Sequence, residues 1–285
     1  MATIRNPIEW SLDQLKSTAH YTQSVRQALQ GAEDRAQRPT VRKISLTDLQ
    51  DVLAKGFEDF MANRTDVLFL CIVYPIAGIV LSRFLFNADL LPLLFPLASG
   101  FALLGPIAAI GLYEMSRRRE QGLEANWTDV FATLASPSVG AILVLGLLLL
   151  LIFAIWLSVA HLIYSVTLGA TPSASFGDFA TAVLTTGAGW KMIVLGTGVG
   201  FLFAAAVLMI SVVSFPLLLD RNVGLVVAVG TSLRAVWANP KAMAAWGLIV
   251  AGGLVLGSIP VFLGLILVMP ILGHATWHLY RKVVV

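Results

Sequence analysis

Charged residues are scarce in this chain. Asp, Glu, Lys and Arg make up only 12% of its 285 residues, whereas soluble domains carry roughly 25%. Hydrophobic residues account for 58%, and the mean hydropathy is +0.84. A soluble core cannot bury this much apolar surface. The composition therefore excludes an ordinary soluble domain and predicts that lipid solvates part of the chain.

Cysteine is nearly absent as well. Cys71 is the single cysteine and lies in an apolar run, which excludes an internal disulfide and a cysteine metal cluster. The net charge of +3 is typical of the Lys and Arg in cytoplasmic loops of membrane proteins, so no nucleic-acid partner is expected. No apolar run precedes residue 65. We therefore expect no cleavable secretory signal and insertion through the first membrane helix.

The usual marks of catalysis and coupled transport are missing too. The apolar segments carry no Asp, Glu, Lys or Arg near mid-depth, where coupled transporters usually need one. There is no His-Glu metalloprotease motif or nucleophile elbow. The glycine-rich "GTGVG" at 196–200 lies inside an apolar segment with no strand before it, so it is not a phosphate-binding loop. We expect no enzyme, no catalytic residue and no metal or cofactor.

Apolar segments long enough to cross a bilayer dominate residues 41–285, after a polar tail over 1–40 that contains one short stretch of helical, amphipathic spacing. A spanning helix needs about 20 apolar residues. The stretch 242–280 is too long for one helix, and "GSIP" at 257–260 predicts a tight hairpin within it. We predict an all-α, polytopic membrane protein with six transmembrane helices, at about 66–86, 90–113, 138–166, 191–217, 242–257 and 260–280.

Positive charge is distributed unevenly over this arrangement. With six spans both termini share a side, and only Arg83 and Lys191 lie on the other side. The positive-inside rule then places both termini in the cytoplasm. The side of the termini carries fourteen Lys and Arg residues outside the first 30 positions: Arg35, Arg38, Arg42, Lys43, Lys55, Arg64, Arg117, Arg118, Arg119, Arg221, Arg234, Lys241, Arg281 and Lys282.

Amphipathic segments precede three of the predicted spans. The segment at 45–64 has a helical apolar stripe, and the segments at 126–137 and 222–240 have a similar pattern. The C-terminal residues of the three segments read "MANR", "LASP" and "WANP". This weak repeat predicts three membrane hairpins, each following an interfacial helix, and a fourth amphipathic piece at 175–184 falls in an outer loop. The stripe of the first segment consists of Leu46, Leu49, Val52, Leu53, Phe57, Phe60 and Met61.

Two histidines near the C-terminus are one helical turn apart. His274 and His278 in "GHATWHLYR" share a helix face near the cytoplasmic surface, whereas His161 is expected on the opposite side of the bilayer. One interpretation is a metal or haem site, although a structural zinc site needs four ligands. The other is an amphipathic headgroup belt formed by Trp277, His278, Tyr280, Arg281 and Lys282.

A carboxylate at the apolar boundary is the sharper candidate. Glu114 is followed by three arginines, and Arg117 or Arg118, Arg64 and His278 are its candidate partners. One hypothesis is a cytoplasmic vestibule that binds an ion or an anion. The other is a salt-bridged rim with snorkelling arginines. The candidate binding residues are Arg64, Glu114, Arg117, Arg118, His274 and His278.

Three blocks of sequence resemble a known bacterial family. They are "VRKISLTDLQDVLAKGFEDFMANRTDVLFLCIVYPIAG", "FPLASGFALLGPIAAIGLYEMSRRREQG" and "ILGHATWHLYRKVV", which together are similar to the integral membrane family called domain of unknown function 2189 over roughly residues 40–283. The family has no established activity. Some members are named automatically as cytochrome c oxidase subunits. The depths of the histidines in this chain exclude the ligand set of a catalytic oxidase subunit, which leaves a haem-free accessory subunit as an alternative.

These expectations combine into one functional hypothesis. We expect a multi-pass protein of the bacterial inner membrane that acts as a non-enzymatic scaffold or accessory protein. Its partners are the lipid bilayer and either other membrane proteins or further copies of the chain. The alternatives are a small-solute or ion transporter or channel, and the accessory oxidase subunit.

Overall fold

The computed structural model describes residues 39–62, 93–123, 136–169, 175–260 and 262–285, together with positions 76, 79, 80 and 83. Three predictions fall wholly or almost wholly outside these residues: the polar N-terminal tail, the first membrane span and the interfacial helix at 126–137.

The elements in the described part of the chain are all helices, and the one extended feature is an isolated antiparallel bridge between Val41 and Val284. The all-α prediction is therefore confirmed for these residues. The helices are α2 (Leu46–Ala62), α5 (Leu94–Ala108), α6 (Ile110–Glu120), α7 (Val139–Thr167), α8 (Phe176–Thr185), α9 (Gly187–Ser211), α10 (Ser214–Asp220), α11 (Leu225–Ala238), α12 (Pro240–Ser258) and α13 (Leu265–Val283).

Three helical stretches among the described residues are long and apolar enough to cross a membrane. They are α7, the combined stretch Gly187–Asp220 and α12, and they match the third, fourth and fifth predicted spans. The second predicted span is divided at Ala109 into α5 and α6. The sixth corresponds to α13. The total of six crossings stays a prediction.

A proline explains why the fourth stretch is interrupted. The helix α9 ends at Ser211 and α10 begins at Ser214. Pro216 has no amide hydrogen to donate to the carbonyl of Val212, four residues earlier, and its ring clashes with that carbonyl. The chain therefore breaks at Val212 and Val213 and resumes as a short helix whose residues from Ser214 to Leu219 are buried.

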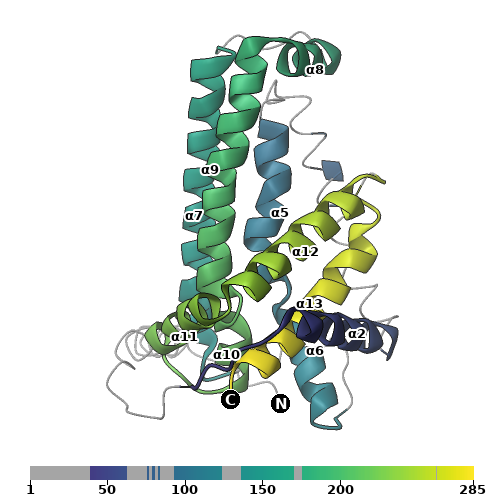
Figure 1. Ribbon diagram of the computed structural model, residues 1–285, viewed down its shortest axis with the longest axis vertical. Coiled ribbons are helices and arrows are strands. Elements are labelled where there is room, and N and C mark those ends of the chain that lie inside the picture. Colours follow the sequence, from purple (N-terminus) through teal and green to yellow (C-terminus); the bar gives the residue numbers. More distant parts are fainter. Residues whose placement is uncertain are drawn as a thin grey trace, which may run out of the picture.

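The upright part of the molecule is a bundle of α5, α7 and α9, with α8 at its far end (Figure 1). Trp156 of α7 is buried at its centre. Its indole Nε1 is 3.0 Å from the hydroxyl of Ser99 and 3.2 Å from the carbonyl of Pro96, and its ring contacts Phe203. A tryptophan can be buried in this way because its N–H finds acceptors there.

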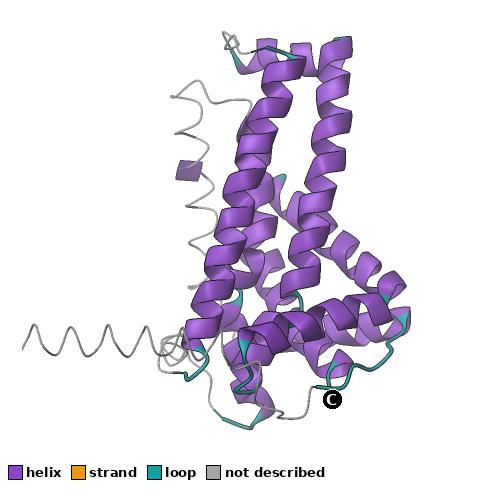
Figure 2. Cartoon of the chain, turned by 90° about the vertical axis from the view of Figure 1, so that its left-hand side faces the viewer, coloured by secondary structure: helices purple, strands orange, loops and turns teal. Residues whose placement is uncertain are grey.

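The opposite end is a second level of helices, which lie across the bundle (Figures 1 and 2). Here α2 and α13 run antiparallel, because Lys282 binds Asp48 while Ala275 lies against Gly56. The extended segment before α2 also pairs with the C-terminus, and Arg42 donates its amide to the carbonyl of Val283 at 2.8 Å. The two ends of the described chain are therefore joined in one layer.

The packing of α2 divides its predicted apolar stripe. Leu49, Val52 and Phe60 are buried, whereas Phe57 and Met61 are about half exposed. The protein itself covers one side of the stripe, because α13 packs there. Leu46 joins the exposed row. The amphipathic helix is confirmed, but only part of its apolar face is free to meet lipid.

We predict that Gly56→Ala weakens the docking of α2. A Cβ at this position would lie 2.6 Å from the Cβ of Ala275, so the helices must separate, at a cost of about 1–3 kcal/mol. Gly230→Ala in α11 is the matched control, because nothing lies within 4 Å of its Cβ position. Thermal unfolding in mild detergent should show a lower midpoint for Gly56→Ala alone. Equal midpoints for the two variants would contradict the close approach.

Candidate functional site: a buried acid and two histidines

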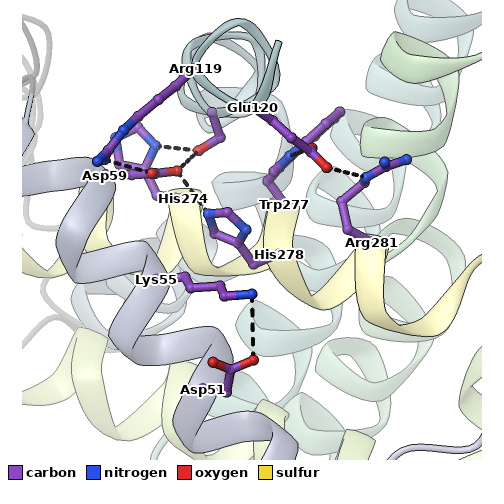
Figure 3. A network of polar contacts seen from close by, with 10 residues as sticks. Asp51, Lys55, Asp59, Arg119, Glu120, His274, Trp277, His278 and Arg281 are labelled. Atoms are coloured by element: carbon purple, nitrogen blue, oxygen red, sulfur yellow. Dashed lines mark hydrogen bonds and ion pairs between the residues drawn. The ribbon is translucent and has the colours of Figure 1, made fainter. Parts of the chain in front are cut away.

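A buried carboxylate is at the centre of the polar contacts among α2, α6 and α13. Asp59 of α2 is only 6% exposed. Its Oδ2 atom accepts a hydrogen bond from the hydroxyl of Ser116 in α6 at 2.6 Å and lies 2.8 Å from Nε2 of His278 in α13. Its Oδ1 atom is 2.8 Å from Nη1 of Arg119. Figure 3 shows Arg119 and His278 converging on the acid.

A second histidine extends this network into the core. Nδ1 of His274 lies 2.7 Å from the hydroxyl oxygen of Ser116, and the His274 side chain is completely buried. We call the set formed by Asp59, Ser116, Arg119, His274 and His278 the Asp59 cluster. It joins α2, α6 and α13 through side chains that are up to 219 positions apart in sequence.

The proton positions in the cluster follow from its geometry. The single hydroxyl proton of Ser116 is donated to the Asp59 carboxylate. The oxygen of Ser116 must then accept a proton from Nδ1 of His274, because a hydroxyl has one donor. Nε2 of His274 is left as a buried lone pair, and it has no hydrogen-bond partner. An unsatisfied buried acceptor of this kind costs about 1–3 kcal/mol.

The environment of Asp59 keeps its carboxyl group charged. Burial by itself would raise its pKa, but the hydrogen bonds from His278 and Ser116 and the electrostatic attraction of His278 outweigh burial. The pKa of Asp59 consequently lies below the ordinary value for an aspartate.

The second predicted candidate, Glu114, has local partners. Its two carboxylate oxygens accept hydrogen bonds from Nε and Nη2 of Arg117, each at 2.8 Å, and Nε of Arg118 is 3.3 Å from Oε1. Both arginines are within one turn of the glutamate on α6. Two of the predicted partners are therefore confirmed, His278 is wrong because it binds Asp59, and Arg64 lies outside the described residues.

The predicted headgroup belt is partly wrong. Trp277 and Tyr280 are buried inside the protein. The indole Nε1 of Trp277 is 3.1 Å from the carboxylate of Glu120, and the hydroxyl of Tyr280 donates to Asp220 at 2.5 Å. Arg281 reaches the same two acids. These aromatic groups join α6, α10 and α13 to one another, since acids from neighbouring helices accept their polar hydrogens.

Sequence reasoning selected both histidines but missed their main partner. Asp59 lies in the first amphipathic segment but is not part of its apolar stripe, so the pattern places it on the polar side. The one signal in the sequence is its position directly before Phe60, a residue of the predicted apolar stripe. Ser116 and Arg119 carry no such mark. Predicted residues thus fall into two groups, with His274 and His278 in the Asp59 cluster and Glu114, Arg117 and Arg118 in a separate ion pair.

The cluster is suited to holding helices together and to exchanging a proton. The side chain of His278 is partly exposed, and hydrogen bonds lead from it through Asp59 and Ser116 to His274. Among the described residues, no group of three or more His, Cys, Asp or Glu side chains is arranged to hold a metal ion. His161 is at an exposed position near the C-terminal end of α7. The helix α7 extends to the end of the molecule at α8, away from α2 (Figure 1).

The long apolar helices and this polar end define a helical integral membrane protein. A comparison with protein families agrees, because the model of the family described as "Predicted integral membrane protein (DUF2189)" matches residues 94–220. The match confirms the resemblance over residues 94–220. It includes the second of the three quoted blocks and runs from α5 to the end of α10. No curated protein and no solved structure matches the chain.

We predict that Asp59→Asn destabilises the protein by about 1.5–3 kcal/mol, the usual worth of hydrogen bonds to a charged group. Asp51→Asn on the same helix is the control. The Asp51 side chain is 44% exposed and pairs with Lys55 and Lys282, and exposed pairs contribute only about 0.2–1 kcal/mol. Chemical unfolding in detergent measures both changes. A larger loss for Asp51→Asn would show that the buried acid is not the stabilising group.

The stabilisation from Asp59 should depend on pH. Its lowered pKa means that the unfolded chain binds the proton more readily than the folded protein does. The difference in unfolding free energy between the wild type and Asp59→Asn should be constant above the ordinary aspartate pKa of about 3.9. It should shrink as the pH falls below that value. Unfolding measured at several values from pH 7 to pH 3 tests this, and a difference that grows in acid would contradict it.

Proposed function

We propose that this chain is a non-enzymatic scaffold or accessory protein of the bacterial inner membrane. Its partners would be lipid and either other membrane proteins or further copies of itself. Both termini would be on the cytoplasmic side, as the distribution of Lys and Arg predicts.

One observation carries this proposal. Among the described candidates, Glu114 pairs with Arg117 and His278 with Asp59. His274 contacts Ser116 through Nδ1. These polar groups therefore make contacts between and within helices. Large apolar side chains are exposed on the same helix layer. Leu46, Phe57 and Met61 of α2 are 45–56% exposed, and exposed apolar groups of this kind mark sites of contact with lipid or protein.

We predict that the recovery of partners depends on the exposed apolar side chains of α2 and not on Glu114 of α6. The full-length protein would be purified from native membranes in mild detergent, with mass spectrometry of the proteins and lipids that accompany it. Phe57→Ser combined with Met61→Ser should lower recovery several-fold, because the exposed apolar area is reduced. Glu114→Gln should leave recovery unchanged. The opposite pattern would exclude the scaffold role as proposed, and a stable co-purifying oxidase would identify the partner class.

A transporter is the second candidate, and the unpartnered Nε2 of His274 favours it. A buried lone pair at the end of a hydrogen-bonded chain can accept a proton. In proteoliposomes a proton-coupled transporter should show solute or proton flux that Asp59→Asn reduces, at a protein concentration for which the variant is still folded. A scaffold should show no flux in either form.

A further inference from the structure

The paired helices α12 and α13 and the turn between them are unusually apolar. No Asp, Glu, Lys or Arg occurs between Lys241 and Arg281. The turn itself reads "GSIPVFLG" over 257–264. Its one polar side chain, Ser258, donates its hydroxyl proton to the carbonyl of Leu254 at 2.7 Å. A loop in water would instead carry polar side chains, since exposed apolar groups are unfavourable there.

Large apolar side chains project outward all around this tip. The most exposed of them reach 72% of their full accessible area. Water is a poor solvent for such a cluster, and no described element covers it. The exposed apolar side chains on either side of the turn are Val255, Leu256, Ile259, Leu263 and Leu267.

Backbone hydrogen bonds form within the described part of the turn. Phe262 donates to the carbonyl of Ser258 at 3.1 Å, and Leu263 donates to Pro260 at 3.0 Å. Leu265 donates to Phe262 at 3.0 Å, while Pro260 has no amide hydrogen that needs a partner. Internal hydrogen bonding of this kind is what a chain reversal in hydrocarbon requires, because no water is present to satisfy the backbone.

Close packing keeps the reversal narrow. A Cβ on Gly264 would lie 2.8 Å from the Cα of Gly257, so only glycine allows the two helices to approach at the tip. Phe262 adopts a left-handed backbone conformation, with φ of 64°, which is uncommon for a residue with a side chain. The turn is therefore a built structure and not an irregular surface loop.

The length of α13 sets the depth of this tip. The nine residues from Leu265 to Gly273 precede His274, the first residue of the Asp59 cluster, and they rise only about 14 Å. The hydrocarbon core of a bilayer is about 30 Å thick. The charged helix α2 packs against the remainder of α13, so that part must be at the headgroup level.

The arrangement of the helices agrees with this estimate. The helices α7 and α9 extend up to the level of α8, whereas the turn between α12 and α13 lies well below α8 (Figure 1). The helix α12 is long enough to cross a membrane, but it is inclined to α7 and α9 (Figure 1), which shortens its reach along the bundle.

We propose that α12 and α13 form a re-entrant hairpin that enters and leaves the bilayer on the side of α2. Its tip inserts among the acyl chains of that leaflet, so neither helix makes the complete crossing that the fifth and sixth predicted spans imply. The hairpin and the apolar row of α2 then both add cross-section to one leaflet. This inference is independent of the scaffold role, because it concerns how the chain meets lipid and not which protein it binds.

Single cysteines in the full-length protein test the depth of the tip. Cys71→Ser removes the native thiol, and Leu263→Cys marks the tip. Thr181→Cys on α8 and Gln50→Cys on α2 are exposed controls for the two ends of the molecule. With a membrane-impermeant maleimide in sealed vesicles, each control should react from one side only. Leu263→Cys should react at least tenfold more slowly from either side, and should react fully after detergent denaturation.

A spin label at the same cysteine separates burial in lipid from burial in protein. The re-entrant hairpin should give high oxygen accessibility and low accessibility to a water-soluble nickel chelate, as near the bilayer centre. Ile259→Cys, on the other arm of the turn, should behave identically, so the test survives if one variant does not fold. Rapid maleimide labelling of the tip from the side of Thr181→Cys, or high nickel accessibility, would overturn the hairpin and restore a complete crossing.

Discussion

The burial of the Asp59 carboxylate is the constraint on which the packing of α2, α6 and α13 depends. A charged group can leave water only where ion pairs and hydrogen bonds replace its hydration. Here Arg119 and Ser116 of α6 and His278 of α13 supply them. Satisfying one acid thus fixes the positions of α2, α6 and α13 relative to one another, and the small residues Gly56 and Ala275 allow the close approach that this requires.

The two halves of α13 consequently have different environments. The N-terminal half is entirely apolar and has one face exposed, with Leu267 half exposed while Leu265 and Met269 are buried. In the C-terminal half, the polar groups of His274, Trp277 and Tyr280 are buried against α2, α6 and α10. A hydropathy average over the whole helix combines these two environments. The sequence from 242 to 280 has no charged residue, so hydropathy alone predicts two complete spans there. In the structure, only part of α13 is available to lipid.

The parts of the structure that sequence predicted well are local. The predicted spans at 138–166 and 242–257 agree within two residues with α7 and α12, because the apolar length of a segment is a local property. The pairing of Glu114 with Arg117 and Arg118 was accessible for the same reason, because residues three and four apart lie together on a helix. The pairing of Asp59 with His278 was not accessible, because 219 positions separate them and nothing in either local pattern specifies the other.

The amino-acid sequence by itself determined the solvent and the secondary structure. Apolar composition requires lipid, and the length and spacing of the apolar segments require helices. Only the tertiary structure decided which side chains meet and how deep α12 and α13 extend. Hydropathy records how much of a segment avoids water, but it does not specify the orientation of the helix. The inclination of a helix and the partner of a buried acid are set by packing against distant parts of the chain.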